Sequence, residues 1–501
     1  MCRDLAAVEQ ICDLSAPDRR ALESPEHPIV ILPRRANCDA PQALAPGNRT
    51  LGVMLPYTPL HHLLFRGAPY DALVLTSGNL SEEPIVTRNG EAAEHLAGIA
   101  DWFLTHDRDI FMRADDSVVR TFAGATRVLR RSRGYAPRTV DIDREMPELL
   151  AVGGELKNAF CLTKGRHAIL SQHIGDLENY ETLVFFEETL GNLKKLFRVE
   201  PKAVAHDLHP GYLSTKFALA MEGLPKIGVQ HHHAHIASCM AENGVAGDII
   251  GVAFDGTGYG TDGKIWGGEF FTGGYSVFAR RAHFRYVKLA GGDAAIREPW
   301  RAAMAYLIDA FGTGWEHLLR SVPDEKLSVV RRMMEGRNNT VETSSCGRLF
   351  DAVAAILGLR REVTFEGQAA IELEAVAHPS ETKAYDFAIP QTAEGWEVDF
   401  RSTMQLIASA IRAGEEAPTV AARFHNTVAE ATEMTCRILR EATGLDRVCL
   451  SGGTFQNVRL TEQLNTALAQ AGFKVYLHRR IPPSDAGIAL GQAAIASWGR
   501  K

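Results

Sequence analysis

The chain has 501 residues, of which 46% are hydrophobic and 23% are charged, and its formal net charge is −7. This length exceeds what a single hydrophobic core organises, so two or three domains are expected. No apolar run approaches the roughly 18 residues of a membrane helix, and the acidic balance disfavours nucleic-acid binding.

Residues 1 to about 142 alternate short apolar segments with helical stretches, which predicts an α/β domain. The N-terminus lacks the basic and then apolar pattern of a secretory signal, so a cytoplasmic protein is expected. The polar stretch Asp141–Pro147 ends in proline, and we place a domain boundary between residues 142 and 143. The expected strands are Pro28–Pro33, Leu51–Leu55 and Ala72–Thr76, and the expected helices are Leu5–Leu14 and Glu91–Ile99.

The region 143–501 contains a weak internal duplication. Two Gly-punctuated β-meanders suggest the actin-like two-lobed ATPase architecture, with lobes at about 148–245 and 246–501 and nucleotide in the cleft between them. The first meander is expected at Leu149–Gly154, Ala159–Thr163 and His167–Gly175, and the second at Ile249–Gly258, Lys264–Phe271 and Gly274–Phe278. Further along, helices are expected at Pro299–Phe311, Thr403–Ile411 and Asn457–Ala471, and a strand entering a glycine turn at Arg447–Gly453.

Four histidines fall within five residues of the segment QHHHAHIASCMAENG. No helix breaker follows until Asn243-Gly244, which would end a helix. Residues i and i+4 share a helix face, so His231 and His235 can bind one metal ion, while His232 and His233 point elsewhere. A surface or core histidine cluster is the alternative. Two imidazoles completed by a carboxylate would suit iron or zinc.

Asp255, Gly256, Thr257 and Gly258 follow the apolar run Ile249–Phe254. Such a tight turn exposes backbone N–H groups that can bind phosphate oxygens, and the aspartate can hold a cation. A plain hairpin turn would show the same residues.

Gly452 and Gly453 also join a strand to a helix, and the missing side chains would let a nucleotide approach the backbone. Asp485 falls near the start of a helix, where it is either an N-cap or the carboxylate that completes the histidine pair. In the first domain, the turn containing Ser77 and Asn79 and a downstream arginine series suit phosphate or carboxylate recognition, although a turn with solvated charges is the alternative.

Eight cysteines are scattered along the chain and none forms a CxxC pair. This excludes a four-cysteine zinc module and indicates reduced thiols. Cys239 and Cys449 are expected to be core residues.

These segments together resemble the HypF family of hydrogenase maturation carbamoyltransferases over nearly all of the chain. Residues 28–138 are similar to part of the family's YrdC-like domain, through PIVILPRR, LGVMLPYTPLHHLL, LVLTSGNLSEEPI and RRSRGYAP. Residues 148–501 are similar to its Kae1-like domain, through VQHHHAHIASCMAE, FDGTGYGTDGKIWGGEF, SSCGRLFDAVAAILG, LSGGTFQN and SDAGIALGQ. The implied fold is a partial YrdC-like α/β domain followed by a two-lobed, actin-like ATPase-fold domain.

The resemblance implies a reaction that uses carbamoyl phosphate and ATP with Mg²⁺. Carbamate would be activated as carbamoyl-AMP in the YrdC-like domain. The Kae1-like domain would then transfer the carbamoyl group to the C-terminal cysteine thiol of the partner HypE, forming the precursor of the cyanide ligand of [NiFe] hydrogenase. Because the thiolate arrives on the partner, no catalytic nucleophile is expected in this chain.

The resemblance also implies roles for individual residues. The metal would be held by His231, His235 and Asp485, with Asp255 as a fourth contact. Gly256, Thr257 and Gly258 would line the phosphates. The ribose and adenine side would be contacted by Asp351, Gly367 and Asn457, near the glycine turn Gly452-Gly453. The adenylate in the first domain would be contacted by Ser77, Asn79 and Arg130.

The sequence departs from the family pattern at its start. The family begins with an acylphosphatase-like domain and two zinc modules, and its early YrdC-like strand with a basic cluster would precede Met1. We therefore expect an incomplete adenylating half: the chain is a fragment, its gene start is altered, or another chain supplies the missing parts.

Three other functions share parts of this pattern. The first is a transferase of the kind that makes threonylcarbamoyladenosine in tRNA, which the acidic charge and the histidine segment disfavour. The second is an O-carbamoyltransferase acting on a small molecule. The third is a non-enzymatic chain that binds nucleotide and docks HypE.

Overall fold

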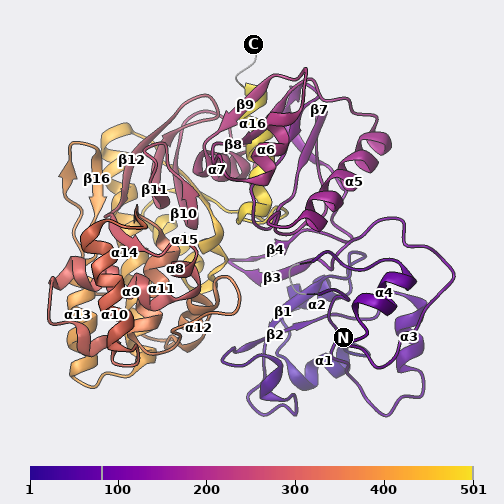
Figure 1. Ribbon diagram of the computed structural model, residues 1–501, viewed down its shortest axis with the longest axis horizontal. Coiled ribbons are helices and arrows are strands. Elements are labelled where there is room, and N and C mark those ends of the chain that lie inside the picture. Colours follow the sequence, from indigo (N-terminus) through magenta and orange to yellow (C-terminus); the bar gives the residue numbers. More distant parts are fainter. Residues whose placement is uncertain (81–82, 499–501) are drawn as a thin grey trace. The chain divides into compact units, whose positions relative to one another are not determined.

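The computed structural model describes residues 1–80 and 83–498 (Figure 1). These residues fold into two compact units. The first unit contains Met1–Val229, Met240–Val245 and residues 478–498, and the second contains Gln230–Cys239 and Ala246–Leu477. Among the described residues, no helix is both long and apolar enough to cross a membrane.

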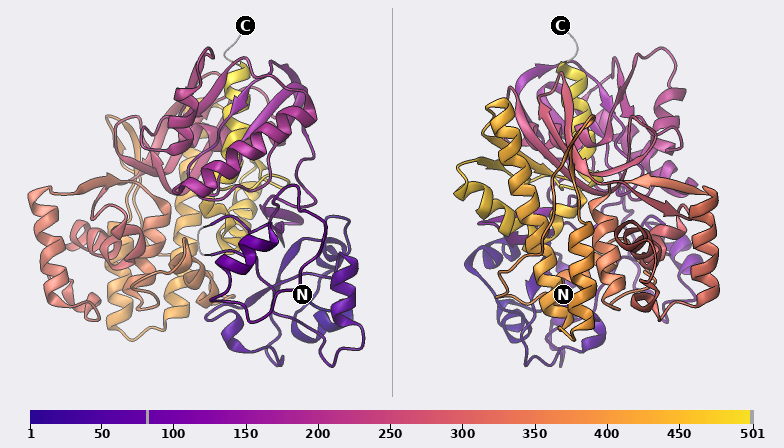
Figure 2. Two further views of the ribbon diagram at one scale, coloured as in Figure 1. Left: turned by 45° about the vertical axis from the view of Figure 1, so that its right-hand side comes forward. Right: turned by 90° about the vertical axis from the view of Figure 1, so that its left-hand side faces the viewer.

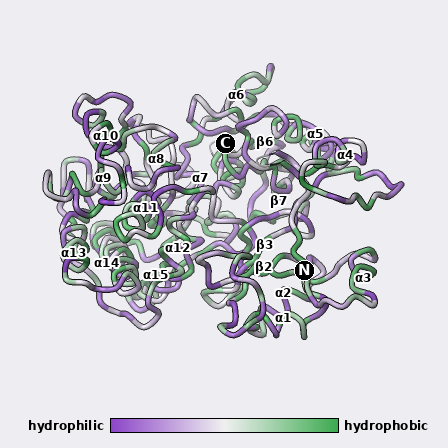
Figure 3. Tube along the Cα trace, turned by 60° about the horizontal axis from the view of Figure 1, so that its bottom comes forward, coloured by the Kyte–Doolittle hydropathy of each residue, from purple (hydrophilic) through white to green (hydrophobic). Residues whose placement is uncertain are grey.

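The first unit begins with a four-stranded sheet in the order β2-β1-β3-β4. Helix α2 starts at a capping box, in which Ser15 and Asp18 satisfy each other's backbone N–H groups. Its Leu22 packs with Val30 and Val119 of the sheet in one apolar cluster, and Figure 3 marks apolar residues in green. The strands are β1 (Ile29–Pro33), β2 (Thr50–Val53), β3 (Val118–Phe122) and β4 (Ala125–Arg130), and the helices are α1 (Leu5–Ile11), α2 (Ala16–Leu22), α3 (Pro59–Phe65), α4 (Asn89–His95) and the 3₁₀ turn η1 (Gln42–Leu44).

The strand predicted at Ala72–Thr76 is wrong. Only Ala72 forms a bridge, to Cys2, and Leu73 exchanges hydrogen bonds with Met1. Val74 is 80% exposed. The backbone N–H and C=O groups of a strand need hydrogen-bond partners on a neighbouring strand. This segment has such a neighbour only at its first residues.

The rest of the first unit is a five-stranded sheet in the order β5-β7-β6-β8-β9. Its strands are β5 (Val140–Met146), β6 (Leu150–Ala151), β7 (Cys161–Leu170), β8 (Val204–Asp207) and β9 (Lys226–Val229), and its helices are α5 (Tyr180–Phe197), α6 (Leu213–Ala220), the end of α7 (His231–Glu242) and α16 (Ile488–Trp498), which follows the 3₁₀ turn η4 (Asp485–Gly487). The polar stretch expected to be a boundary forms β5, and the two strands expected at Ala159–Thr163 and His167–Gly175 are one continuous strand, β7.

The second unit is built on a larger sheet with the path β15-β16-β12-β11-β10-β17-β18, to which β13 and β14 add. Helices α9, α11 and α14 lie beside it (Figures 1 and 2). The strands are β10 (Ile249–Tyr259), β11 (Ile265–Gly273), β12 (Phe278–Phe284), β13 (Val287–Ala290), β14 (Thr340–Thr343), β15 (Gln391–Thr392), β16 (Gly395–Val398), β17 (Arg447–Ser451) and β18 (Lys474–Tyr476). The helices are α8 (Ala294–Arg297), α9 (Pro299–Phe311), η2 (Glu316–Leu319), α10 (Asp324–Gly336), α11 (Cys346–Ile356), α12 (Gln368–Val376), α13 (Arg401–Arg412), α14 (Ala417–Thr443), η3 (Gly453–Gln456) and α15 (Val458–Gln470).

The predicted duplication is visible in the strand directions of the two sheets. In β5-β7-β6-β8-β9, the first two pairings are antiparallel and the next two are parallel. The path β12-β11-β10-β17-β18 repeats this order. The two copies differ in chain order. The edge strand that pairs with β7 is β5, which comes before β6 and β7 in the chain, whereas the corresponding strand β12 comes after β10 and β11. In the second copy, β12 starts at Phe278, because residues 274–277 form the turn.

Candidate metal and nucleotide site

Helix α7 begins at His231, and the side chain of Gln230 fixes that start. The Gln230 amide oxygen accepts a hydrogen bond from the N–H of His233 (2.9 Å), and its amide nitrogen donates to the carbonyl of Tyr259 in β10 (3.0 Å). One residue thus satisfies a free N–H of the first turn and joins the helix to the strand. The helix ends where predicted, with Gly244 at a φ of 62°.

Asp255 lies inside β10 rather than at its end. The strand was predicted to enter a tight turn at Asp255–Gly258, but it runs on to Tyr259. Its pairing with β11 is interrupted between Phe254 and Gly258 and then resumes at Gly258 and Trp266. This bulge leaves residues 255–257 outside the ladder with β11, so their backbone groups can serve other partners.

The carboxylate of Asp255 lies against both predicted metal-binding histidines of α7. Its Oδ2 atom is 3.4 Å from Nε2 of His231 and 3.0 Å from Nε2 of His235. All three side chains are buried, and each offers a ligand atom within 4.8 Å of the others. The i and i+4 spacing on one helix face therefore brings two imidazoles to one carboxylate, as a metal site requires.

The electrostatics of Asp255 favour the ionised form. Burial raises the pKa of this carboxyl, but hydrogen bonds from His231 and His235 and the charges of these residues outweigh burial, so its pKa lies well below the usual range. The other oxygen, Oδ1, accepts hydrogen bonds from the backbone N–H groups of Gly256 (2.8 Å) and Gly453 (3.3 Å). The carboxylate is therefore oriented by the two glycine segments expected to bind nucleotide.

The two other histidines of α7 have different surroundings. His233 stacks on Phe278 at 4.2 Å between ring centroids and contacts the carbonyl of Gly274. His232 is buried and its Nε2 has no hydrogen-bond partner. Burial and the neighbouring His231 lower the pKa of His232 well below its usual value. Both rings belong to the packing around the site.

Glycine is required at several positions because backbones and rings approach closely there. A Cβ atom on Gly258 would lie 2.4 Å from Cε1 of His232 and 2.6 Å from Cδ2 of His231. A Cβ atom on Gly452, which has a φ of 105°, would lie 2.1 Å from the carbonyl oxygen of Phe254. The side chains absent here let β10, β17 and α7 meet around Asp255.

The N-terminus of α11 is attached to the same bulge. Ser345 caps this helix and accepts a hydrogen bond from the N–H of Arg348. Its hydroxyl also lies 2.9 Å from the carbonyl oxygen of Asp255 and 2.7 Å from that of Gly256. The free N–H groups and positive dipole end of α11 therefore face the segment that was predicted to line phosphates.

Three predicted nucleotide contacts lie on neighbouring helices of the second unit. Asp351 in α11 forms an ion pair with Arg348 at 3.0 Å. Asn457 caps α15, and its amide nitrogen lies 3.0 Å from Nε2 of His425. Gly367, with a φ of 73°, precedes α12. Sequence reasoning missed Arg348 and His425, although the spacing of Arg348 and Asp351 by three residues on a helix is a readable signal of an ion pair.

The remaining predicted residues lie in the first unit. Asp485 starts η4, and its carboxylate approaches Gly154, where an added Cβ would lie 3.3 Å from Oδ2. The side chain of Asn79 donates hydrogen bonds to the carbonyls of Leu80 and Glu83. Ser77 is exposed, and Arg130 ends β4. Within the parts of the chain that the structure describes, no hydrogen bond or ion pair joins Ser77 or Asn79 to Arg130.

Family models match three consecutive stretches of the chain. Residues 1–132 match a model described as telomere recombination, residues 144–242 match the HypF Kae1-like domain, and residues 251–492 match the second subdomain of the carbamoyltransferase Kae1-like domain. A carbamoyltransferase HypF homolog from Cupriavidus necator is 35% identical over 374 residues, which cover 94% of that protein and 72% of this chain. The chain belongs to the HypF carbamoyltransferase family.

Longer HypF proteins extend beyond the matched region. Carbamoyltransferase HypF2 of Cupriavidus necator is 41% identical over 99% of this chain and 66% of its own length. A crystal structure of full-length HypF in a phosphate- and nucleotide-bound form superimposes with a TM-score of 0.95 and 44% identity, covering 99% of this chain and 65% of that one. The chain thus spans about two thirds of the length of these relatives. The α/β fold with YrdC-like and Kae1-like regions is confirmed.

Proposed function

We propose that this chain is a carbamoyltransferase of [NiFe] hydrogenase maturation. It would transfer a carbamoyl group from carbamoyl-AMP to the C-terminal cysteine thiol of a HypE-like acceptor. The observation that carries the proposal is the convergence of His231, His235 and Asp255 beside Gly256 and Gly453 in a chain of the HypF family. Side chains able to bind a metal and glycine backbone able to bind phosphate would adjoin each other there, an arrangement that can stabilise the charge developing on a leaving phosphate.

The metal would be iron or zinc, held by His231, His235, Asp255 and, by the family pattern, Asp485. The donor set fits, because two imidazole nitrogens and an ionised carboxylate are ligands that both metals accept. A bound ion of this kind would supply Lewis acidity toward phosphoryl and carbamoyl oxygens.

The nucleotide would lie along the bulge of β10. Gly256, Thr257 and Gly258 would line its phosphates, together with Gly452 and Gly453. Asp351, Gly367 and Asn457 would lie on the ribose and adenine side, and Mg²⁺ would accompany ATP. Support comes from the glycine backbones that surround Asp255 and from the N-terminus of α11, which faces the bulge.

The transfer step needs no nucleophile from this chain. The thiolate sulfur of the acceptor forms a bond to the carbamoyl carbon, and the bond from that carbon to the phosphate oxygen breaks. AMP leaves with the electron pair, and the acceptor becomes a thiocarbamate. Cys239 and Cys449 are buried in the core, consistent with having no part in this chemistry. Formation of carbamoyl-AMP from carbamoyl phosphate and ATP would use Ser77, Asn79 and Arg130 in the first unit.

The test separates transfer from adenylation. Purified chain and a HypE-like acceptor receive either synthetic carbamoyl-AMP or ATP with carbamoyl phosphate. AMP is measured by chromatography and the acceptor thiocarbamate by intact mass. We expect thiocarbamate from carbamoyl-AMP, and we expect His231→Ala/His235→Ala to lose both the product and the bound metal.

His233→Gln is the matched control, since His233 lies on the same helix but packs on Phe278. It should retain metal and transfer. Absence of product from carbamoyl-AMP with the metal-loaded wild type would refute the transferase. Product from carbamoyl-AMP but not from ATP with carbamoyl phosphate would restrict the proposal to the transfer half.

A further inference from the structure

Arg348 is a buried arginine whose hydrogen-bonding capacity is only partly used. It lies in the first turn of α11 and is 7% exposed. Its Nη2 atom pairs with Asp351 at 3.0 Å, whereas Nε and Nη1 are buried without any hydrogen-bond partner. A guanidinium is always charged, so two buried N–H donor atoms without acceptors are costly for the folded state.

The guanidinium lies at the glycine segment of β10. A Cβ atom on Gly256 would be 3.5 Å from Nη2 of Arg348. The neighbouring Gly347 approaches more closely still, since a Cβ there would lie 2.8 Å from Cα of Gly256. The start of α11 and the Nη2 atom of Arg348 therefore lie next to the bulge. The unused Nε and Nη1 belong to the same planar guanidinium group.

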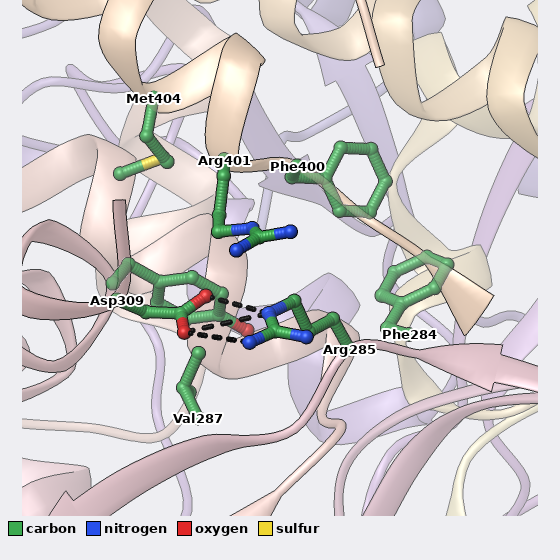
Figure 4. Close-up of a pocket in the computed structure, with 8 residues that line it drawn as sticks. Phe284, Arg285, Val287, Asp309, Phe400, Arg401 and Met404 are labelled. Carbon is green, nitrogen blue, oxygen red and sulfur yellow. Dashed lines mark hydrogen bonds and ion pairs between the residues drawn. The ribbon is translucent and has the colours of Figure 1, made fainter. Parts of the chain in front are cut away.

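Among the described arginines of the second unit, Arg280 and Arg459 each leave one buried guanidinium nitrogen without a partner, whereas Arg348 leaves two. Other arginines of this unit pair with carboxylates. A small pocket lined by Phe284, Arg285, Asp309 and Arg401 contains two guanidiniums (Figure 4). Arg285 binds Asp309 and Glu397, and Arg401 binds Asp399. The hydrogen bonds that Arg285 donates to Asp309 raise the pKa of Arg285 despite its partial burial. Carboxylates of the chain neutralise these arginines, so they offer no comparable place for an anion.

We infer that Arg348 is a phosphate-binding residue, whose Nε and Nη1 donate to a phosphoryl oxygen of a nucleotide held at Gly256–Gly258. The inference rests on the nucleotide site proposed above and adds a charged side chain to the part of that site where backbone would line the phosphates. An arginine presents its donors in a planar array that matches phosphate oxygens. Asp351 then acts as a positioning residue, because its ion pair holds Nη2 and leaves Nε and Nη1 for the ligand.

The experiment compares ligands that differ in phosphate content. Adenosine, AMP and ATP compete with a fluorescent ATP analogue for the wild type, Arg348→Met and Arg348→Lys. We expect Arg348→Met to lower the affinity for AMP and ATP by about 10- to 100-fold, because charged hydrogen bonds are lost. The affinity for adenosine should be unchanged. Arg348→Lys keeps the charge but not the planar array of donors, so its affinity for AMP and ATP should lie between those of the wild type and Arg348→Met.

Arg285→Met is the matched control, because it removes an arginine of the same unit whose three guanidinium nitrogens each donate to a carboxylate. It should bind all three ligands like the wild type, and thermal unfolding checks that each variant is folded. If Arg348→Met is not folded, Arg348→Lys alone decides by the same comparison of ligands.

Two results would overturn the inference while leaving the nucleotide site intact. Equal weakening of adenosine and ATP would show that Arg348 only supports Asp351 on the ribose side, and unchanged ATP affinity would show no contact. Failure of the wild type to bind adenosine or ATP would refute the nucleotide site itself, and the inference would fall with it.

Discussion

A methyl group added at Gly258 would occupy space that two histidine rings already fill. Its Cβ would lie 2.4 Å from His232 and 2.6 Å from His231. We therefore expect Gly258→Ala to displace His231 from Asp255, to lower the free energy of unfolding by about 1–3 kcal/mol and to reduce the metal bound per chain. Urea unfolding and elemental analysis of the purified protein measure the two effects.

Gly191→Ala provides the control for this change. Gly191 lies inside α5, and nothing is within 4 Å of an added Cβ. Alanine should stabilise that helix by about 0.5–1 kcal/mol without altering metal content. If Gly258→Ala bound metal and unfolded like the wild type, the close packing of His231 against β10 would not be needed for the site.

At the scale of single residues, the sequence predicts the candidate site correctly where spacing along one helix determines the geometry. The i and i+4 spacing of His231 and His235 requires only a helix, and the structure places Asp255 against both. Arg348 could not be identified in the same way. Its unused donors depend on which side chains reach it from other elements, and spacing along one helix does not report that.

At the scale of elements, a buried carboxylate joins the end of α7 to the segment after β18. Glu242 accepts hydrogen bonds from Nδ1 of His478 (2.9 Å) and from the N–H of Arg479 (3.0 Å). Burial raises the pKa of Glu242, but these hydrogen bonds and the charge of His478 outweigh it and the pKa is lowered.

A carboxyl with a lowered pKa in the folded state stabilises the fold while it is ionised. That contribution is complete above the unfolded-state pKa of about 4.3 and is lost as pH falls through the lower folded value. We expect Glu242→Gln to lower the free energy of unfolding at pH 7 by about 1–3 kcal/mol. The difference from the wild type should shrink as pH falls below about 4.

Urea unfolding between pH 7 and pH 3.5 measures this difference. Asp143→Asn is the control, because Asp143 pairs with Arg166 at the surface, where the Asp143 side chain is 86% exposed, and such pairs contribute little. A difference between Glu242→Gln and the wild type that stayed constant with pH would show that charge on Glu242 is not what holds α7 to this segment.

Elements were predictable when their own residues determine them. Helix α9 has the predicted bounds Pro299–Phe311, and α7 ends at its predicted Asn-Gly signal. Ala72–Thr76 has the composition of a strand but lacks a neighbour along most of its length, and Asp141–Pro147 looks like a linker yet pairs with β7 as β5. Pairing is a property of two segments, so neither outcome follows from one segment's composition.

At the scale of the whole molecule, the chain returns to its first unit at its end. The predicted second lobe extended to residue 501, but residues 478–498 group with the first unit. Helix α16 is buried almost entirely against the sheet that contains β6, β7 and β8. Its Gln492 accepts a hydrogen bond from the N–H of Gly153 (2.9 Å) and donates to the carbonyl of Gly153 (3.1 Å). A periodicity argument cannot detect this return, because it compares neighbours in sequence.

The first unit should therefore depend on residues far away in sequence. Ending the chain after Leu477 would uncover one face of the sheet, and burial of that apolar face is the main source of its stability. We expect the amide hydrogens of β6, β7 and β8 to lose protection from exchange, while those of β11 and β12, which pair within the second unit, keep theirs.

Gln492→Leu tests the polar contact of α16 alone. It leaves the N–H and carbonyl of Gly153 without Gln492 and should lower the free energy of unfolding by about 1–3 kcal/mol with the sheet intact. Protection of β7 in the shortened chain would show that the first sheet folds without its last helix.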